Sequence, residues 1–231
     1  MNDLQNYLDH HYQTSELFAN TCAISPEELD ILLSQQLIPA PSYNVISDKK
    51  CISQAFGELN STGLRIEKYF HPGNKFWVTL AVETKTKVGS VQAHADLKER
   101  FKQNFAAELK ILNCKIFPLQ DSFTENGSII SDCLGARTDV AWDYFLKGVF
   151  SLCVADPSSV QSIATKEVLQ EALITLTQNG VKTDFNMEEK NHILNLIDQY
   201  EQAAMPFSPV EYPTSSRKRL VEDLRAKLIT D

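Results

Sequence analysis

The chain has 231 residues, 43% of them hydrophobic and 23% charged, and a formal net charge of −8. A chain of this length and composition can bury a substantial core, in one large domain or two smaller ones. The negative charge disfavours nucleic acid and anionic membranes as partners, because both are themselves negatively charged.

Cysteine content and apolar runs indicate the compartment. The five cysteines are scattered without a C-x-x-C pair, as is typical of reduced thiols in a cytosolic protein. The N-terminal stretch MNDLQNYLDHHYQ lacks the basic start and apolar core of a secretory signal. The densest apolar stretch, KFWVTLAV, is too short to cross a bilayer. We therefore predict a soluble, cytoplasmic protein without a membrane partner.

Two short helices are expected at the start of the chain. Apolar spacing predicts the first over residues 3–12, and Thr14 is the expected N-cap of the second. The spacing in the second helix places Leu17, Phe18 and Cys22 toward the core.

The stretch SPEELDILL carries the sharpest local signal in the sequence. Ser25 is a strong N-cap, Pro26 suits the first helical turn, and Glu28 is placed to complete a capping box. The helix should end before LIPAPSY, where two prolines favour extended backbone. The segments YNVIS and CISQAF on either side of the polar turn DKK predict a β-hairpin. Two helices, a turn and a hairpin are the outline of a winged helix-turn-helix.

A long amphipathic helix is expected in the middle of the chain. Residues 59–90 are ambiguous between strand and helix, and we favour a helix that begins after Pro72. From Ser90 onward, apolar residues recur every three or four positions until the chain reaches Phe117. The expected buried face of this helix consists of Leu97, Phe101, Phe105, Leu109 and Leu112.

The remaining sequence is also helical in pattern. After a loop over residues 118–135, helices are expected at 142–153, at 158–178 as one helix or two, after the caps Asn186 and Glu189, and from SSRKRL onward. The segment MPFSPVEYP before the last helix is too rich in proline to be helical. The sequence thus predicts a mainly α protein, with a winged helix-turn-helix-like module and small β-hairpin over residues 1–58 packed on a helical domain over 59–231.

The charge of the N-terminal module argues against DNA binding. Its first 48 residues contain no Lys or Arg, whereas they contain seven acidic residues, among them Glu27 and Glu28. The affinity of a protein for DNA comes largely from Lys and Arg that neutralise phosphates. In a helix-turn-helix the start of the second helix approaches the bases, and here that position is acidic. We therefore expect a packing or protein-docking module, although DNA binding is not excluded.

Locally, the stretch TSELFANTCAISPEELDILLSQQLIPAP resembles the helix-turn-helix of MerR-type regulators. Those proteins often leave the motif through a similar L-I-P-x-P sequence. The resemblance implies the fold of the module, but its second helix lacks the basic and aromatic residues of that family.

Several longer stretches resemble a second family. They are LIPAPSY (37–43), YFHPGNKFWV (69–78), AWDYFLKGVFSLCV (141–154), IATKE (163–167) and AAMPFSPVEYPTSSRKR (203–219). On these stretches, which span most of the chain, the protein is similar to an uncharacterised bacterial family labelled as natural-product biosynthesis proteins. None of the stretches is a known catalytic signature. The resemblance implies an accessory role near a biosynthetic gene cluster.

The cluster TSSRKR is a candidate anion site at the start of the last helix. The hydroxyls of Ser215 and Ser216 and the guanidinium groups of Arg217 and Arg219 could converge there on a phosphate, a carboxylate or an acidic partner. Cations in a first turn oppose the helix dipole and need compensation. The alternative is that the protein's own abundant carboxylates supply it.

Aromatic residues give two further candidates. His71 and Trp77 in YFHPGNKFW could line an aromatic ligand pocket, or they could be core residues with a satisfied imidazole. Trp142 lies between Asp139 and Asp143, which could form an acid/base pair if a pocket enclosed them. The alternative for the two carboxylates is an exposed row of charges.

No metal site and no cofactor are expected. Glu189 and His192 form a single E-x-x-H step, whereas a di-iron bundle needs a second such step and two further Glu. With only eight glycines, the chain has neither G-x-G-x-x-G nor a Walker sequence for phosphate.

Three functions remain open. The leading hypothesis is a cytoplasmic, non-enzymatic accessory or interaction protein with a protein partner, and a homodimer is left open. The second is a MerR-like regulator that senses a small molecule through the helical domain. The third is an enzyme with an unfamiliar site near His71, Trp142 and Arg217.

The acidic module predicts the outcome of a mobility-shift assay. At low salt, where phosphate contacts are strongest, the protein should not retard its own upstream DNA. A discrete shifted band that survives competitor DNA would contradict this prediction and favour the regulator.

Overall fold

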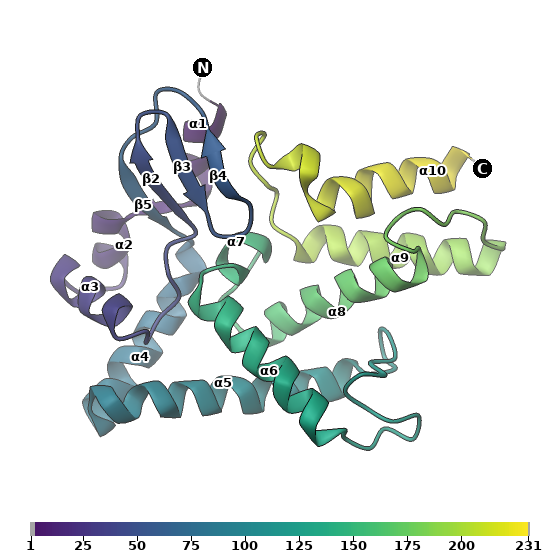
Figure 1. Ribbon diagram of the computed structural model, residues 1–231, viewed down its shortest axis with the longest axis horizontal. Coiled ribbons are helices and arrows are strands. Elements are labelled where there is room, and N and C mark those ends of the chain that lie inside the picture. Colours follow the sequence, from purple (N-terminus) through teal and green to yellow (C-terminus); the bar gives the residue numbers. More distant parts are fainter. Residues whose placement is uncertain (1–2, 231) are drawn as a thin grey trace.

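Helices make up most of the described part of the chain, residues 3–230 of this computed structural model, and one small antiparallel sheet lies toward its N-terminal end (Figure 1). The predicted mainly α fold is therefore confirmed. The N-terminal elements are α1 (Asp3–His11), β1 (Gln13–Thr14), α2 (Ser15–Thr21), α3 (Pro26–Ser34), β2 (Tyr43–Ser47), β3 (Lys50–Ser53), β4 (Gly57–Asn60) and β5 (Glu67–Phe70). They are followed by the 3₁₀ turn η1 (Pro72–Asn74), α4 (Lys75–Val88), α5 (Ser90–Leu112), α6 (Ser131–Leu146), α7 (Phe150–Cys153), α8 (Val160–Leu176), α9 (Met187–Ala203), the 3₁₀ turn η2 (Tyr212–Thr214), the π-helical η3 (Lys218–Asp223) and α10 (Leu224–Thr230).

The sheet has the strand order β1-β5-β2-β3-β4, and every neighbouring pair is antiparallel. The predicted hairpin is confirmed as β2 and β3, in which Tyr43 lies opposite Ser53. The ambiguous segment contributes β5 and then α4, the helix favoured after Pro72. Because residue 58 lies within β4, the sheet continues across the expected boundary and ends at Phe70. The division of the chain into two domains therefore stays a prediction.

The first two helices are placed by a cap and by one aromatic contact. The Thr14 hydroxyl accepts a hydrogen bond from the Leu17 amide, as expected of an N-cap. The predicted inward position of Leu17 is wrong, since its side chain is 52% exposed. Phe18 occupies the core side of α2 instead, where its ring stacks on Phe70 with the centroids 4.8 Å apart.

The third helix is capped as expected, but its first turn is used differently. The Ser25 hydroxyl accepts a hydrogen bond from the Glu28 amide at 3.1 Å. Instead of completing a capping box, the Glu28 carboxylate accepts from the Lys85 ammonium on α4 at 2.8 Å. The largest of three apolar clusters runs from α2 and α3 into α4, α5 and α6, whereas α1 packs with the sheet in another. The N-terminal members of the largest cluster are Phe18, Ala19, Leu29, Leu32, Leu37, Ile38 and Phe70.

The α5 helix lies at the centre of the largest apolar cluster. Its predicted buried face is confirmed from Leu97 to Leu112, and α4, α6 and α8 pack against it. Figure 1 shows α6 crossing α5, with α8, α9 and α10 stacked beyond them. In the described residues, no helix has the length and apolar character that a membrane crossing requires.

A close backbone contact interrupts the helix that was expected over residues 142–153. The α6 helix ends at Leu146, whose carbonyl accepts a hydrogen bond from the Ala40 amide at 2.9 Å. Gly148 follows with φ of +75°, and α7 begins only at Phe150. A Cβ atom on Gly148 would lie 2.4 Å from the Ala40 carbonyl oxygen. The LIPAP segment thus approaches the chain where only glycine leaves room.

A buried carboxylate joins the proline-rich segment to the sheet. Glu211 is 1% exposed and accepts hydrogen bonds from three hydroxyl groups. Tyr43 donates to it at 2.7 Å, and Ser53 and Ser208 each donate at 2.6 Å. Because hydroxyl donors satisfy both carboxylate oxygens, the segment that precedes η2 is fixed against β2 and β3.

Replacing glycine by alanine should have opposite effects on stability at two positions, Gly148 just after α6 and Gly135 within it. Gly148→Ala should lower the free energy of unfolding by about 2–4 kcal/mol, because the new Cβ is strained at positive φ and collides with Ala40. Gly135→Ala should raise it by about 0.5–1 kcal/mol, since alanine favours a helix interior. No atom lies within 4 Å of a Cβ at Gly135. Urea denaturation measures the free energy of unfolding of both variants. Equal values would contradict the positive φ of Gly148 and its close approach to Ala40.

Candidate functional site

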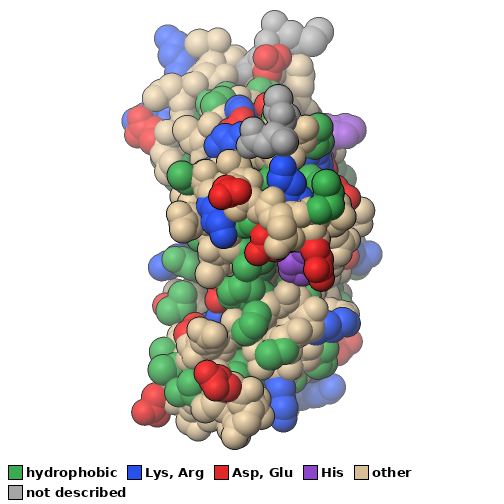
Figure 2. Space-filling model, turned by 90° about the vertical axis from the view of Figure 1, so that its right-hand side faces the viewer, with side chains coloured by type: hydrophobic (Ala, Val, Ile, Leu, Met, Phe, Trp, Pro, Cys, Tyr) green, Lys and Arg blue, Asp and Glu red, His purple; other side chains and the backbone are tan. Residues whose placement is uncertain are grey.

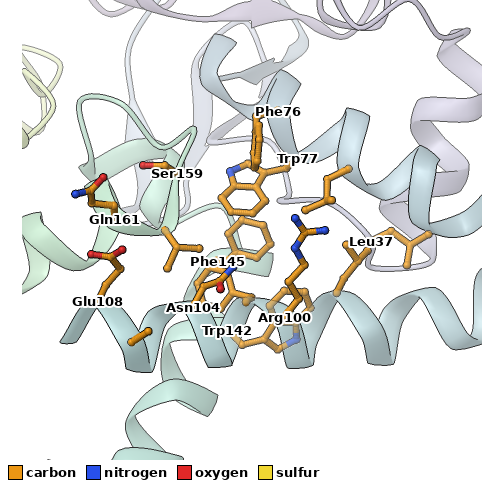
Figure 3. A pocket seen from close by; sticks show the side chains of 15 residues that line it. Leu37, Phe76, Trp77, Arg100, Asn104, Glu108, Trp142, Phe145, Ser159 and Gln161 are labelled. Carbon is orange, nitrogen blue, oxygen red and sulfur yellow. The ribbon is translucent and has the colours of Figure 1, made fainter. Parts of the chain in front are cut away.

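An aromatic pocket lies between α4, α5, α6 and the first turn of α8, with a volume of about 290 Å³ (Figure 3). Both tryptophans of the chain line it. The other lining residues are Leu37, Phe76, Leu80, Leu97, Arg100, Phe101, Asn104, Ala107, Glu108, Phe145, Ser159, Val160 and Gln161. Concave sites with mainly apolar walls and a few polar groups are the usual form of small-molecule sites.

The pocket walls are held in place by ring contacts. The Phe145 ring lies 4.7 Å from Trp77, 4.8 Å from Phe101 and 5.2 Å from Trp142, measured between centroids. The Trp77 indole nitrogen donates to the Pro157 carbonyl at 2.7 Å. Because its one polar group is already satisfied, Trp77 presents only an apolar ring to the pocket.

A polar row of α5 faces this pocket. Arg100, Asn104 and Glu108 are spaced by four residues and so lie on one side of the helix. Figure 3 shows the Arg100 guanidinium toward the Leu37 end and the Glu108 carboxylate toward Gln161. The pocket therefore combines an aromatic floor with one cation and one carboxylate at opposite ends.

The first turn of α8 lines the end of the pocket at which Glu108 lies. The Ser159 hydroxyl caps this helix by accepting a hydrogen bond from the Ser162 amide at 3.1 Å. Helix N-termini carry partial positive charge, which favours a nearby carboxylate such as Glu108.

The structure brings Trp77 and Trp142 together in this pocket but places His71 elsewhere. His71 is 8% exposed, and its Nδ1 atom accepts a hydrogen bond from the Gly73 amide at 3.0 Å. Its ring packs edge-on against Tyr12. His71 thus corresponds to the alternative of a core residue with a satisfied imidazole.

The candidate anion residues near the C-terminus are occupied by the protein's own groups. The Arg217 Nη1 atom donates to the carbonyls of Glu201 and Ala204 at 2.5 and 2.7 Å, so it caps the end of α9. The Ser216 hydroxyl bonds to Tyr200 at 2.8 Å. Figure 2 shows Lys and Arg interspersed with Asp and Glu on the face toward the C-terminus. These contacts agree with internal compensation.

The other two members of that cluster are engaged in the same way. Ser215 is buried, where its hydroxyl donates to the Tyr212 carbonyl and accepts from the Lys218 amide. Arg219 donates to the Asn179 side chain at 2.9 Å. Of the three residues named for an enzyme site, only Trp142 lines the aromatic pocket; Arg217 lies at the end of α9 and His71 beside Tyr12.

Asp139, one of the two acidic residues beside Trp142 in the sequence, is paired with two lysines of α5. The Asp139 carboxylate binds Lys98 at 3.0 Å and Lys102 at 2.9 Å. Hydrogen bonds from Lys102 and Lys98 hold the pKa of Asp139 below its ordinary value, which keeps the carboxylate ionised. Glu189 is also occupied, since it completes the predicted capping box with Asn186 at the start of α9.

Residues 97–229 match the sequence profile of DUF6058, described as a family of unknown function. The chain belongs to the DUF6058 family. No curated protein and no solved structure matches the chain. The DUF6058 region begins at Leu97 and supplies the α5, α6 and α8 walls of the pocket, whereas Trp77 and the N-terminal elements precede it.

The sequence did not identify the polar residues of this pocket. Arg100, Asn104 and Glu108 could have been found from their spacing of four beside the apolar stripe of α5. That spacing is shared by solvent-exposed rows, however, so it does not distinguish a pocket from a helix surface.

The buried His71 predicts a dependence of stability on pH. Burial lowers the pKa of His71 to about 4, below its ordinary value near 6.5. The contribution to stability is present above pH 6.5 and is lost as the pH falls toward 4, because only the unfolded state takes up the proton readily. This loss should reach about 3 kcal/mol.

The variant His71→Asn isolates that contribution. Its side-chain oxygen can accept the Gly73 amide, but it does not titrate. Urea denaturation from pH 7 to pH 4 should show a smaller loss of stability in the variant than in the wild type. Parallel pH profiles would mean that His71 stays neutral in both states or is protonated in both.

Proposed function

We propose that this protein is a non-enzymatic accessory protein that binds a small, mainly apolar ligand in the aromatic pocket. The observation that carries this proposal is the set of ring contacts around Phe145, through which the protein's own packing fixes Trp77, Phe101 and Trp142. A preformed apolar pocket binds a ligand without the entropy cost of ordering its own walls.

The N-terminal elements support a docking role beside ligand binding. Their order of helix, helix and hairpin fits the winged helix-turn-helix-like module expected from the sequence. Two of the three acidic residues of α3 form ion pairs within the protein: Glu28 binds Lys85, and Asp30 binds Lys68 at 3.4 Å. Exposed Leu17 on α2 and Ile31 on α3 offer apolar contact area. These features favour a protein partner, or a second copy of the chain, over DNA.

From the resemblance to natural-product biosynthesis proteins, we infer that this role belongs to the bacterial cytoplasm, beside biosynthetic enzymes. The pocket has five aromatic side chains in its lining, and aromatic walls of this kind favour a ligand with aromatic rings. An accessory protein of this kind would hold or present a ligand rather than transform it.

A second candidate is a MerR-like regulator that senses the ligand. Leu37 favours it, because this residue lines the pocket and also follows α3 directly, where its amide donates to the Leu32 carbonyl at 3.0 Å. A ligand that contacts Leu37 could therefore change the position of the helix-turn-helix-like module.

Ligand binding can be tested with 2-naphthamide, a neutral, flat probe of suitable size. A Kd of about 1 mM or tighter is expected for a probe with so few atoms. Binding should shift the indole N–H resonances of Trp77 and Trp142, the two tryptophans of the chain.

Matched variants of α5 locate the binding site. Ala107→Phe should abolish the shifts, because Ala107 lines the pocket and the new ring would fill it. Gln103→Phe should retain them, since Gln103 is exposed and outside the lining. If neither 2-naphthamide nor the acid 2-naphthoate shifts the resonances of the wild type, the proposed function is wrong.

A further inference from the structure

Among the residues that the structure describes, Arg100 is the arginine without a hydrogen-bond partner in the protein. The other five arginines each donate a hydrogen bond to the protein, as Arg137 does to Asp121 and Arg225 does to Asp198. Within residues 3–230, the Arg100 guanidinium has no hydrogen bond or ion pair. Arg100 is exposed on α5, and it lines the aromatic pocket.

The lysines on either side of Arg100 already have a carboxylate partner. Lys98 and Lys102 bind Asp139 on α6. Glu108 lies two helical turns away, roughly 12 Å along the axis, and faces the positive end of α8. Among the lining residues, all of them in the described part of the chain, Arg100 is the one cation.

We propose that the ligand is a flat aromatic acid whose carboxylate binds Arg100 while its rings lie on Trp77 and Phe145. A guanidinium donates two parallel hydrogen bonds to a carboxylate, which fixes the orientation of a planar ligand. The aromatic walls accept the faces or edges of its rings. This inference rests on the proposed function and assigns the chemical class of the ligand.

The volume of the pocket limits the size of that acid. At about 290 Å³ it lies near the lower end of ligand sites, which span roughly 300–1,000 Å³. One ring or two fused rings with a carboxylate fit this space. A large polycyclic product would extend into solvent.

A pair of probes that differ only in charge tests the assignment. The wild type should bind 2-naphthoate about tenfold more tightly than 2-naphthamide, as expected for a hydrogen-bonded charge pair. Arg100→Met should remove this preference by weakening 2-naphthoate about tenfold while changing 2-naphthamide less than about twofold. Titration of the indole resonances gives all four dissociation constants.

Two control variants separate a local contact from the overall charge. Lys110→Met removes one cation from α5 outside the lining, so it should leave both affinities unchanged. Glu108→Gln removes the carboxylate from the lining and should tighten 2-naphthoate about twofold, because like charges repel weakly at that distance. The assignment of an aromatic acid is wrong if the wild type binds the two probes equally, or if Arg100→Met keeps the preference for 2-naphthoate. Either result would leave the proposed function standing. If neither probe binds the wild type, the aromatic acid and the proposed function are both wrong.

Discussion

The packing of Phe101 against four other aromatic rings is the contact on which both the core and the pocket depend. Its centroid lies between 4.8 and 6.2 Å from those of Trp77, Phe105, Trp142 and Phe145. These rings come from α4, α5 and α6, so one cluster fixes the relative positions of three helices. Each such pair adds about 0.5–1.5 kcal/mol beyond the burial of apolar area. The rigidity that defines the pocket is therefore the rigidity of the core itself.

Polar contacts determine how the remaining segments attach to this core. Glu211 receives the hydroxyls of Tyr43 and two serines, which connects the sheet to a segment far along the chain. Arg217 similarly closes the carbonyl end of α9. The Glu211 carboxylate and the Arg217 guanidinium provide partners for polar atoms that would otherwise be buried without a hydrogen bond. Each such unpaired atom would cost about 1–3 kcal/mol of stability. Charged residues that look functional in the sequence can thus serve the fold.

The sequence predicted best those features that depend on short-range physics. The caps Thr14, Ser25 and Asn186 act on amides three residues away, and all three are present. The buried face of α5 follows from periodicity alone. The strand β4 was not predicted, although it pairs with the adjacent strand β3. The strand β5 was not identified because its partners β1 and β2 lie far from it in the chain, and the register is set only in the folded sheet. The break at Gly148 was missed for the same reason, since Ala40 imposes it.

The candidate site shows the same limit in a different form. Trp77 and Trp142 could be named from the sequence because large aromatic residues are scarce and chemically distinctive. Arg100 could not, since a cation on an amphipathic helix looks identical whether it faces solvent or a pocket. What separates Arg100 from the paired lysines beside it is the position of Asp139, and that depends on how α6 crosses α5. The functional meaning of a charge is therefore a property of the helix packing rather than of the residue.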